Sequence, residues 1–118
     1  MGTTPAKMTE LNLEQGRPYA DAAERRLRDG VATFRRTGVR FVRVIHGYGS
    51  TGEGGAIRTR TRSVLAEWMR GRRLQGVVPG ERFGSADADA IALAALFPGL
   101  RAVADWNAGN PGITIIVL

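Results

Sequence analysis

The residue best suited to chemistry in this sequence is its only histidine, His46. A histidine side chain has an ordinary pKa close to neutrality, so it can give or take a proton near pH 7. His46 follows an apolar run and precedes a glycine-rich loop, a position at which α/β proteins often bind ligands. It is therefore a candidate general acid or base for phosphodiester cleavage, with a structural, hydrogen-bonded role as the alternative. Tyr48 is a candidate to stack on a nucleic-acid base, with local packing as the alternative.

The loop has glycines at the spacing Gly47-x-Gly49-x-x-Gly52, which formally matches a dinucleotide-binding fingerprint. That fingerprint also requires an acidic residue about 20 residues further on, and this chain has arginines there instead. A P-loop is excluded too, because no Gly-Lys-Ser/Thr sequence ends the loop. The loop is better suited to bring backbone N–H groups to a phosphate, beside Arg58 and Arg62 on one helix face. We expect a nucleic-acid phosphate, with a small phosphate or nucleotide ligand as the alternative.

Positive charge is concentrated in one half of the chain. The net charge is +6 at neutral pH, and residues 17–73 contain fourteen arginines against five acids. Residues 74–118 contain two arginines against four acids. A basic platform of this kind is typical of proteins that bind a phosphate backbone, although an arginine-rich composition also arises without selection for binding.

The composition is typical of one soluble globular domain. With 118 residues, 43% hydrophobic and 24% charged, the chain is long enough for a single core. No apolar run approaches the ~20 residues that cross a membrane, and no signal-peptide pattern is present, so we expect a cytoplasmic protein without a membrane partner. Because cysteine is absent and histidine occurs once, disulfides and thiolate zinc sites are excluded. Residues 1–8 are expected to be disordered, and residues 9–118 to form the domain.

Hydrophobic periodicity predicts strands that alternate with helices. Strands are expected at residues 9–13, 41–45, 76–78 and 113–118. Helices are expected at residues 18–38, from the glycine loop to residue 71, and at 87–97. Asp21 and Glu24 have the spacing of a capping box at the start of the first helix. The order β-α-β-α-(β)-α-β predicts an α/β fold, a two-layer sandwich with a mixed sheet.

The stretch VIHGYGSTGEGGAIR at residues 44–58 carries a motif known from one protein family. It resembles the HGxG signature of Smr (small MutS-related) domains, which lies between a strand and a helix. The family's other signature, LDLHG, resembles the stretch LNLEQG at residues 11–16. The helix between them and the closing GITIIVL strand also fit, so the resemblance runs from about residue 9 to residue 118. The segment at residues 79–110 is longer than in a minimal Smr domain, and we expect it to pack against the sheet edge.

The resemblance implies both a fold and a function. Smr domains have a two-layer fold similar to the C-terminal domain of a bacterial translation initiation factor. Members bind DNA or RNA, and several are endonucleases that nick DNA or cut mRNA at stalled ribosomes. We therefore expect a nucleic-acid-binding domain with DNA, RNA or the ribosome as partner, and a DNA-nicking or RNA endonuclease as its enzymatic form. A non-catalytic DNA-, RNA- or ribosome-binding module is the alternative.

The resemblance also assigns candidate site residues. His46, Gly47 and Gly49 match the HGxG signature. In the first signature, Asn12 replaces the acid and Glu14 replaces the histidine. Asparagine cannot act as a base, whereas the Glu14 carboxylate can, and it can also bind Mg²⁺ or Mn²⁺. The implied catalytic pair is His46 and Glu14, and the residues expected to contact nucleic acid are Asn12, Gly47, Tyr48, Gly49, Gly52, Arg58 and Arg62.

Overall fold

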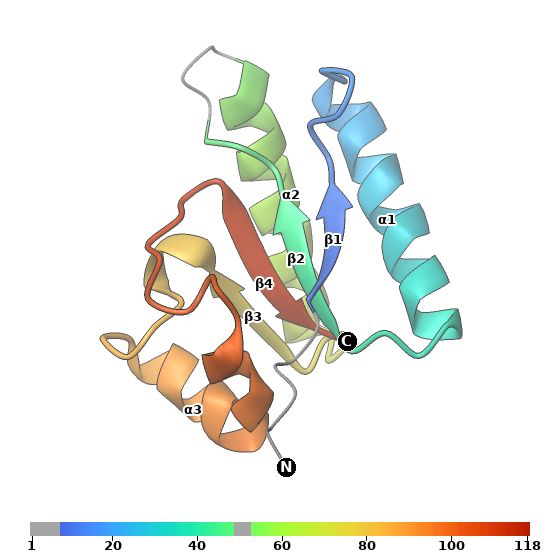
Figure 1. The fold of residues 1–118 in the computed structure, drawn as a ribbon. Coiled ribbons are helices and arrows are strands. Elements are labelled where there is room, and N and C mark those ends of the chain that lie inside the picture. The colour runs from blue at the N-terminus through green and yellow to red at the C-terminus, as the bar shows by residue number, and fades with distance from the viewer. Residues whose placement is uncertain (1–7, 49–52) are drawn as a thin grey trace.

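The computed structural model describes residues 8–48 and 53–118. Within them, the elements follow the predicted order of alternating strands and helices (Figure 1). The α/β fold with a mixed sheet is therefore confirmed. The disorder expected for residues 1–8 concerns a segment outside the described residues, apart from Met8, which packs against the core.

Four strands form one mixed sheet (Figure 1). They are β1 (Thr9–Asn12), β2 (Phe41–Ile45), β3 (Gly76–Pro79) and β4 (Ile113–Val117). The order across the sheet is β1-β2-β4-β3, with β1 parallel to β2 and β4 antiparallel to both of its neighbours. Because β1 and β2 are parallel and adjacent, they end at the same edge of the sheet, and the segments that follow them meet there.

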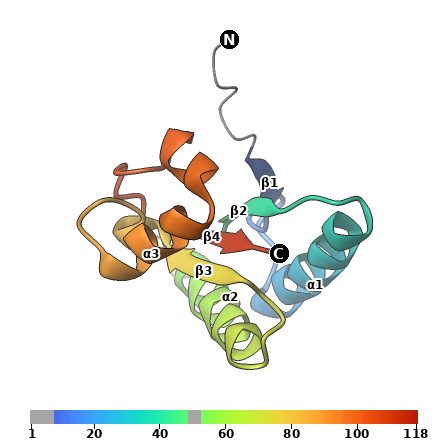
Figure 2. The same cartoon turned by 90° about the horizontal axis from the view of Figure 1, so that it is seen from below.

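Two long helices, α1 (Ala20–Arg36) and α2 (Glu53–Arg70), cover one face of the sheet (Figure 2). The buried residues of α1 are Ala23, Leu27 and Val31. Since residues three or four apart share one side of a helix, these three form a single apolar stripe. The stripe packs with buried residues of α2 and the sheet in one hydrophobic cluster, and this packing fixes both helices against the sheet.

The start of α1 differs from the prediction. Tyr19 is the residue at the N-cap, and its side chain makes no capping hydrogen bond. Asp21 and Glu24 instead bind Arg60 of α2, at 2.9 and 3.1 Å between nitrogen and oxygen. The predicted capping box is therefore wrong, because an arginine on the neighbouring helix attracts both carboxylates away from the helix terminus.

The second face of the sheet is covered by the segment at residues 79–110. It contains a 3₁₀-helix (Gly80–Arg82), α3 (Ala88–Leu96) and a second 3₁₀-helix (Pro98–Ala102). Phe83 and Leu100 are fully buried in the hydrophobic cluster that this segment forms with the sheet. The expected packing against the sheet edge is thus corrected to packing over a face, and the segment adds a smaller third layer (Figure 2).

β4 is apolar on both sides because both faces of the sheet are covered. All five of its residues are buried. Ile116 joins the cluster under α1 and α2, while Ile113 and Ile115 join the cluster under α3. Thr114 is two residues from Ile116 and so lies on the same face. There its hydroxyl meets the ring of His46.

Candidate nucleic-acid interface

The ends of β1 and β2 bring the two signature-like segments together. Asn12 is paired with Ile45 in the parallel register, and the Leu13 N–H donates to the Ile45 carbonyl at 2.8 Å. A side chain at Gly47 would overlap the Glu14 carboxylate, so these two positions are in direct contact. Glu14 therefore lies at the HGxG turn, although it is far from that turn in the sequence.

Asn12 shapes the turn that presents Glu14. Its side-chain oxygen accepts a hydrogen bond from the Glu14 backbone N–H at 2.9 Å, which is the geometry of an Asx turn. An aspartate accepts the same bond, so the asparagine retains the turn while it removes a negative charge. Contact between Asn12 and nucleic acid stays a prediction.

His46 is completely buried at this junction, with 0% of its surface exposed. Its Nδ1 lies 2.7 Å from the Gly47 carbonyl oxygen, and its Nε2 lies 2.8 Å from the Thr114 hydroxyl oxygen. A carbonyl oxygen can only accept, so Nδ1 carries the proton and donates it, and Nε2 accepts from the Thr114 hydroxyl. Both ring nitrogens are thus used inside the chain, and the ring holds the Gly47 carbonyl in place.

The surroundings of His46 keep its ring neutral at pH 7. The pKa of His46 is lowered from 6.5 to about 4, chiefly because burial disfavours the charged ring, and further because Arg62 and Arg58 carry positive charge nearby. The hydrogen bond to Gly47 and the charge of Glu81 act in the opposite direction. Proton transfer by His46 to a substrate would therefore require the ring to leave this pocket.

Two backbone N–H groups of the turn point into the protein. The N–H groups of His46 and Gly47 both donate to the Gly112 carbonyl, at 3.0 and 2.9 Å. Because these two amides are already hydrogen-bonded inside the chain, they are not the phosphate-binding N–H groups that the loop was expected to supply. Gly49 and Gly52, the other predicted loop contacts, lie outside the described residues.

Tyr48 is the exposed aromatic residue beside the turn, with 59% of its surface accessible. Its ring lies next to Gly112, where an added Cβ atom would be 3.3 Å from Tyr48 Cδ1. The ring is therefore supported at one point by the backbone and open elsewhere. This leaves room for the predicted stacking on a base.

Arg58 and Arg62 lie on one side of α2, and both bind Glu81. Arg62 forms a two-pronged pair with the Glu81 carboxylate at 2.8 and 2.6 Å, and Arg58 adds a contact at 2.9 Å. The Arg62 Nε donates to the Thr114 hydroxyl at 3.3 Å. A continuous path of hydrogen bonds thus runs from Glu81 through Arg62 and Thr114 to His46. The pKa of Glu81 is lowered from 4.5 to about 2, mainly by its hydrogen bonds with Arg62.

Glu81 and Thr114 are the two members of this path that sequence reasoning missed. Thr114 is the lone polar residue in the closing run ITIIVL, and that interruption is a signal in the sequence that it has a polar partner. Glu81 carries no comparable signal, because it follows an ordinary Pro-Gly turn. Only the sheet order brings it to α2.

Replacing Glu81 with glutamine is expected to lower the free energy of unfolding by about 1 kcal/mol at pH 7, after discounting for partial exposure. Because the folded-state pKa of Glu81 is depressed to about 2, its contribution is present above pH 4.5 and is lost as the pH falls towards 2. Urea denaturation at several pH values measures this difference. Glu67→Gln, an exposed position on α2, the helix that carries the arginine partners of Glu81, is the matched control and should change nothing. Equal stabilities of the two variants at pH 7 would contradict the ion-pair geometry.

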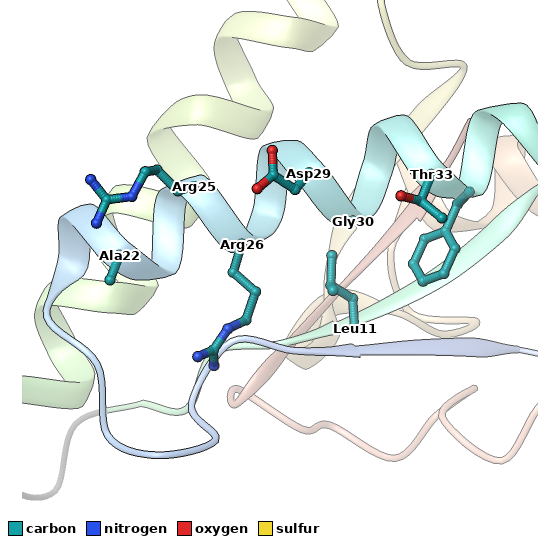
Figure 3. A pocket seen from close by; sticks show the side chains of 8 residues that line it. Leu11, Ala22, Arg25, Arg26, Asp29, Gly30 and Thr33 are labelled. Atoms are coloured by element: carbon teal, nitrogen blue, oxygen red, sulfur yellow. The ribbon is translucent and has the colours of Figure 1, made fainter.

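A shallow groove runs between α1 and the edge strand β1 (Figure 3). Leu11 forms its floor and points at Gly30, while Arg25 and Arg26 project from α1 beside it (Figure 3). Arg26 donates to the Gln15 carbonyl at 2.8 Å, which ties α1 to the turn after β1. The basic surface of the first helix is therefore continuous with the turn that carries Glu14.

Two kinds of feature are absent from residues 8–48 and 53–118. No helix there is long and apolar enough to span a lipid bilayer. The same residues contain no group of three or more His, Cys, Asp or Glu side chains that could hold a metal ion. Glu14, the predicted metal ligand, thus belongs to no such group.

Comparison with known proteins gives one match. The family model described as Smr domain matches residues 17–81, just over half of the chain. The matched part contains the HGxG turn and both arginines that bind Glu81. It begins after residues 11–16, so the correspondence of that stretch with the first signature stays a prediction. No curated protein and no solved structure matches the chain.

Proposed function

We propose, because the chain belongs to the Smr domain family, that it binds nucleic acid at the sheet edge where Glu14 meets the HGxG turn. The observation that carries this proposal is the contact between Glu14 and Gly47. It joins the two segments that resemble the family's signatures at a single surface. Tyr48 is exposed beside that surface and supplies a ring on which a base can stack.

Arg58 and Arg62, the arginines behind the turn, have different roles in the proposed binding of phosphate. Arg62 donates to Glu81, to Thr114 and, more weakly, to two backbone carbonyls. Within the described residues, Arg58 gives a single hydrogen bond, to Glu81, and so retains other N–H donors. We therefore propose Arg58 as the direct phosphate contact and Arg62 as the residue that fixes the surrounding structure.

His46 acts as a positioning residue in this proposal. Its ring is neutral, and its Nδ1–H holds the Gly47 carbonyl, so it sets the conformation of the turn that faces the nucleic acid. A positioning role explains why a histidine with two internal hydrogen bonds stands at the base of the loop. It does not require the ring to exchange a proton with the substrate.

A second candidate function is endonucleolytic cleavage of DNA or RNA, favoured by the half-buried carboxylate of Glu14 at the turn. In this reaction, Glu14 takes a proton from a water molecule, and the oxygen of that water attacks phosphorus. The bond from phosphorus to the leaving oxygen breaks, and that oxygen takes a proton from solvent. Arg58 stabilises the negative charge that accumulates on the phosphate. Among the described residues, Glu14 belongs to no group of three or more His, Cys, Asp or Glu side chains, and we propose no metal-dependent step.

Binding is tested by titrating a labelled DNA duplex and an RNA hairpin with the protein between about 50 and 200 mM salt. We expect the affinity to fall steeply with salt. Arg58→Gln should weaken binding several-fold and reduce the slope of log K against log salt by about 1. Arg101→Gln removes the same charge from an exposed position in the segment at residues 79–110 and is the matched control.

The same samples separate the two candidate functions. Incubation of supercoiled DNA and structured RNA with the protein, with and without Mg²⁺ or Mn²⁺, reports cleavage. If cleavage occurs, Glu14→Gln should abolish it while it leaves binding intact. If DNA and RNA stay intact under all conditions, the endonuclease function is wrong and the binding function remains. Equal weakening by Arg58→Gln and Arg101→Gln would show that the interface lies elsewhere.

A further inference from the structure

The largest concentration of unmatched positive charge lies at the other end of the helices from His46. Six exposed arginines occupy the last turns of α1 and α2 and the connections that follow them. They are Arg35, Arg36, Arg40, Arg70, Arg72 and Arg73, and we call this surface the basic end. Figure 2 looks onto this end of the molecule. Since α2 has 18 residues, the basic end is about 27 Å from the HGxG turn along that helix.

The two ends of the helices differ in how their charges are balanced. Near the turn, Arg58 and Arg62 bind Glu81 within 3 Å, and Arg60 binds two acids of α1. At the basic end, no guanidinium lies within 4.0 Å of a carboxylate of the described residues. The basic end therefore holds six guanidiniums that form no ion pair with the described residues.

The basic end is also held in a fixed arrangement. The Arg73 guanidinium lies 5.1 Å from the centre of the Trp68 ring, and Arg28 lies 5.6 Å from the same ring. Arg35 donates to the backbone carbonyl of Arg73, which ties the end of α1 to the connection after α2. The side chains of Arg35 and Arg73 are thus restrained by contacts within the chain, and these two lose less conformational entropy when a ligand binds them.

We propose that the basic end is a second contact surface for the phosphate backbone of nucleic acid. A cluster of arginines without acidic partners among the described residues is suited to a polyanion, since each guanidinium replaces condensed counterions. Lasting attachment to an anionic membrane is favoured by a face of apolar side chains that insert into the lipid. At this end Trp68 is buried beneath two guanidiniums, and Met69 is the one exposed large apolar side chain of the described residues. This inference rests on the proposed function, because it extends the contact with the same partner to the far end of the helices.

The test compares two double variants in the salt titration with the DNA duplex and the RNA hairpin. Arg36→Gln with Arg70→Gln removes two charges from the basic end, and Arg82→Gln with Arg101→Gln removes two charges from the segment at residues 79–110. All four positions are exposed, and thermal unfolding verifies that each protein is folded. We expect the first double variant to weaken binding about 10-fold and to reduce the salt slope by about 2. The second should match the unchanged protein, and Arg36→Lys with Arg70→Lys should keep the salt slope of the unchanged protein.

Each other outcome is decisive. Equal weakening by both double variants would mean that net charge alone matters, and would overturn the basic end as a contact surface. If the first double variant binds like the unchanged protein while Arg58→Gln binds weakly, the basic end is overturned and the proposed function stands. If the unchanged protein binds neither DNA nor RNA, the proposed function fails and this inference fails with it. Loss of slope with only one of the two nucleic acids would support the inference and identify the partner.

Discussion

Lowering the pH from 7 to 4 is expected to remove about 3 kcal/mol of folding free energy through His46 alone. The pKa of His46 is about 4 in the folded chain and near 6.5 when the ring is exposed. Between these values, the unfolded chain binds more protons than the folded chain, so stability rises with pH. The contribution of His46 is fully present above pH 6.5 and is lost as the pH falls towards 4.

Urea denaturation at intervals between pH 4 and 7 measures this loss of stability. In the variant His46→Gln, the pH dependence that comes from His46 should be absent. The variant will be less stable at pH 7, because a buried ring and two hydrogen bonds are disturbed, but its stability should vary less with pH. Glu81 acts mainly below pH 4.5, because its pKa is about 2 in the folded chain, and its effect cancels when the variant is compared with the unchanged protein. A ring that titrates near 6.5 by NMR would show that His46 is exposed in solution, and it would restore proton transfer as its role.

Replacing Gly47 with alanine is expected to destabilise the fold by about 2–3 kcal/mol. Gly47 has a φ of +70°, and a residue with a Cβ atom in this region costs about 1–2 kcal/mol. The added methyl group would also overlap the Glu14 carboxylate, which must then move away from the turn. Chemical denaturation gives the change in stability, and any cleavage activity that depends on Glu14 should fall with it.

Gly38→Ala is the matched control for Gly47→Ala. Gly38 has a φ of +78° but no atom within 4 Å of an added Cβ. Its replacement therefore measures only the free-energy cost of a Cβ atom at positive φ. Combining Gly47→Ala with Glu14→Ala removes the overlap and should reduce the cost to that of Gly38→Ala. If Glu14→Ala has no effect on the cost of Gly47→Ala, the Glu14 side chain does not lie against the turn in solution.

The order of strands and helices could be predicted because local signals agree with the fold. The run FVRVI at β2 and the run ITIIV at β4 are β-branched and bounded by glycine or proline turns. The start of α1 was less predictable, since the partner of Asp21 and Glu24 lies on another helix. The packing of residues 79–110 over a face of the sheet also depends on tertiary structure, because local periodicity does not say which surface covers an element.

The candidate site could be predicted only in part. The approach of Glu14 to the HGxG turn follows from two parallel strands that end together, once the resemblance identifies both segments. The burial of His46 does not follow, because its partner Thr114 is 68 residues away and reaches it only through the pairing of β4 with β2. The ion pairs of Glu81 could not be predicted either, because its partners are on α2. Local sequence identifies the groups that could react. The strand order determines which of them are buried, hydrogen-bonded or ion-paired within the chain.

The position of β4 also has a consequence for how the molecule is made. β4 is the last strand in the chain, yet it lies between β2 and β3 in the sheet. A ribosome therefore releases the part matched by the family model before the strand that completes its sheet. Until β4 inserts, β2 and β3 have open edges, and His46 lacks both Thr114 and the Gly112 carbonyl that anchors its backbone. The nascent chain is thus expected to expose two aggregation-prone strand edges and to complete the surface proposed to bind nucleic acid only when β4 has inserted.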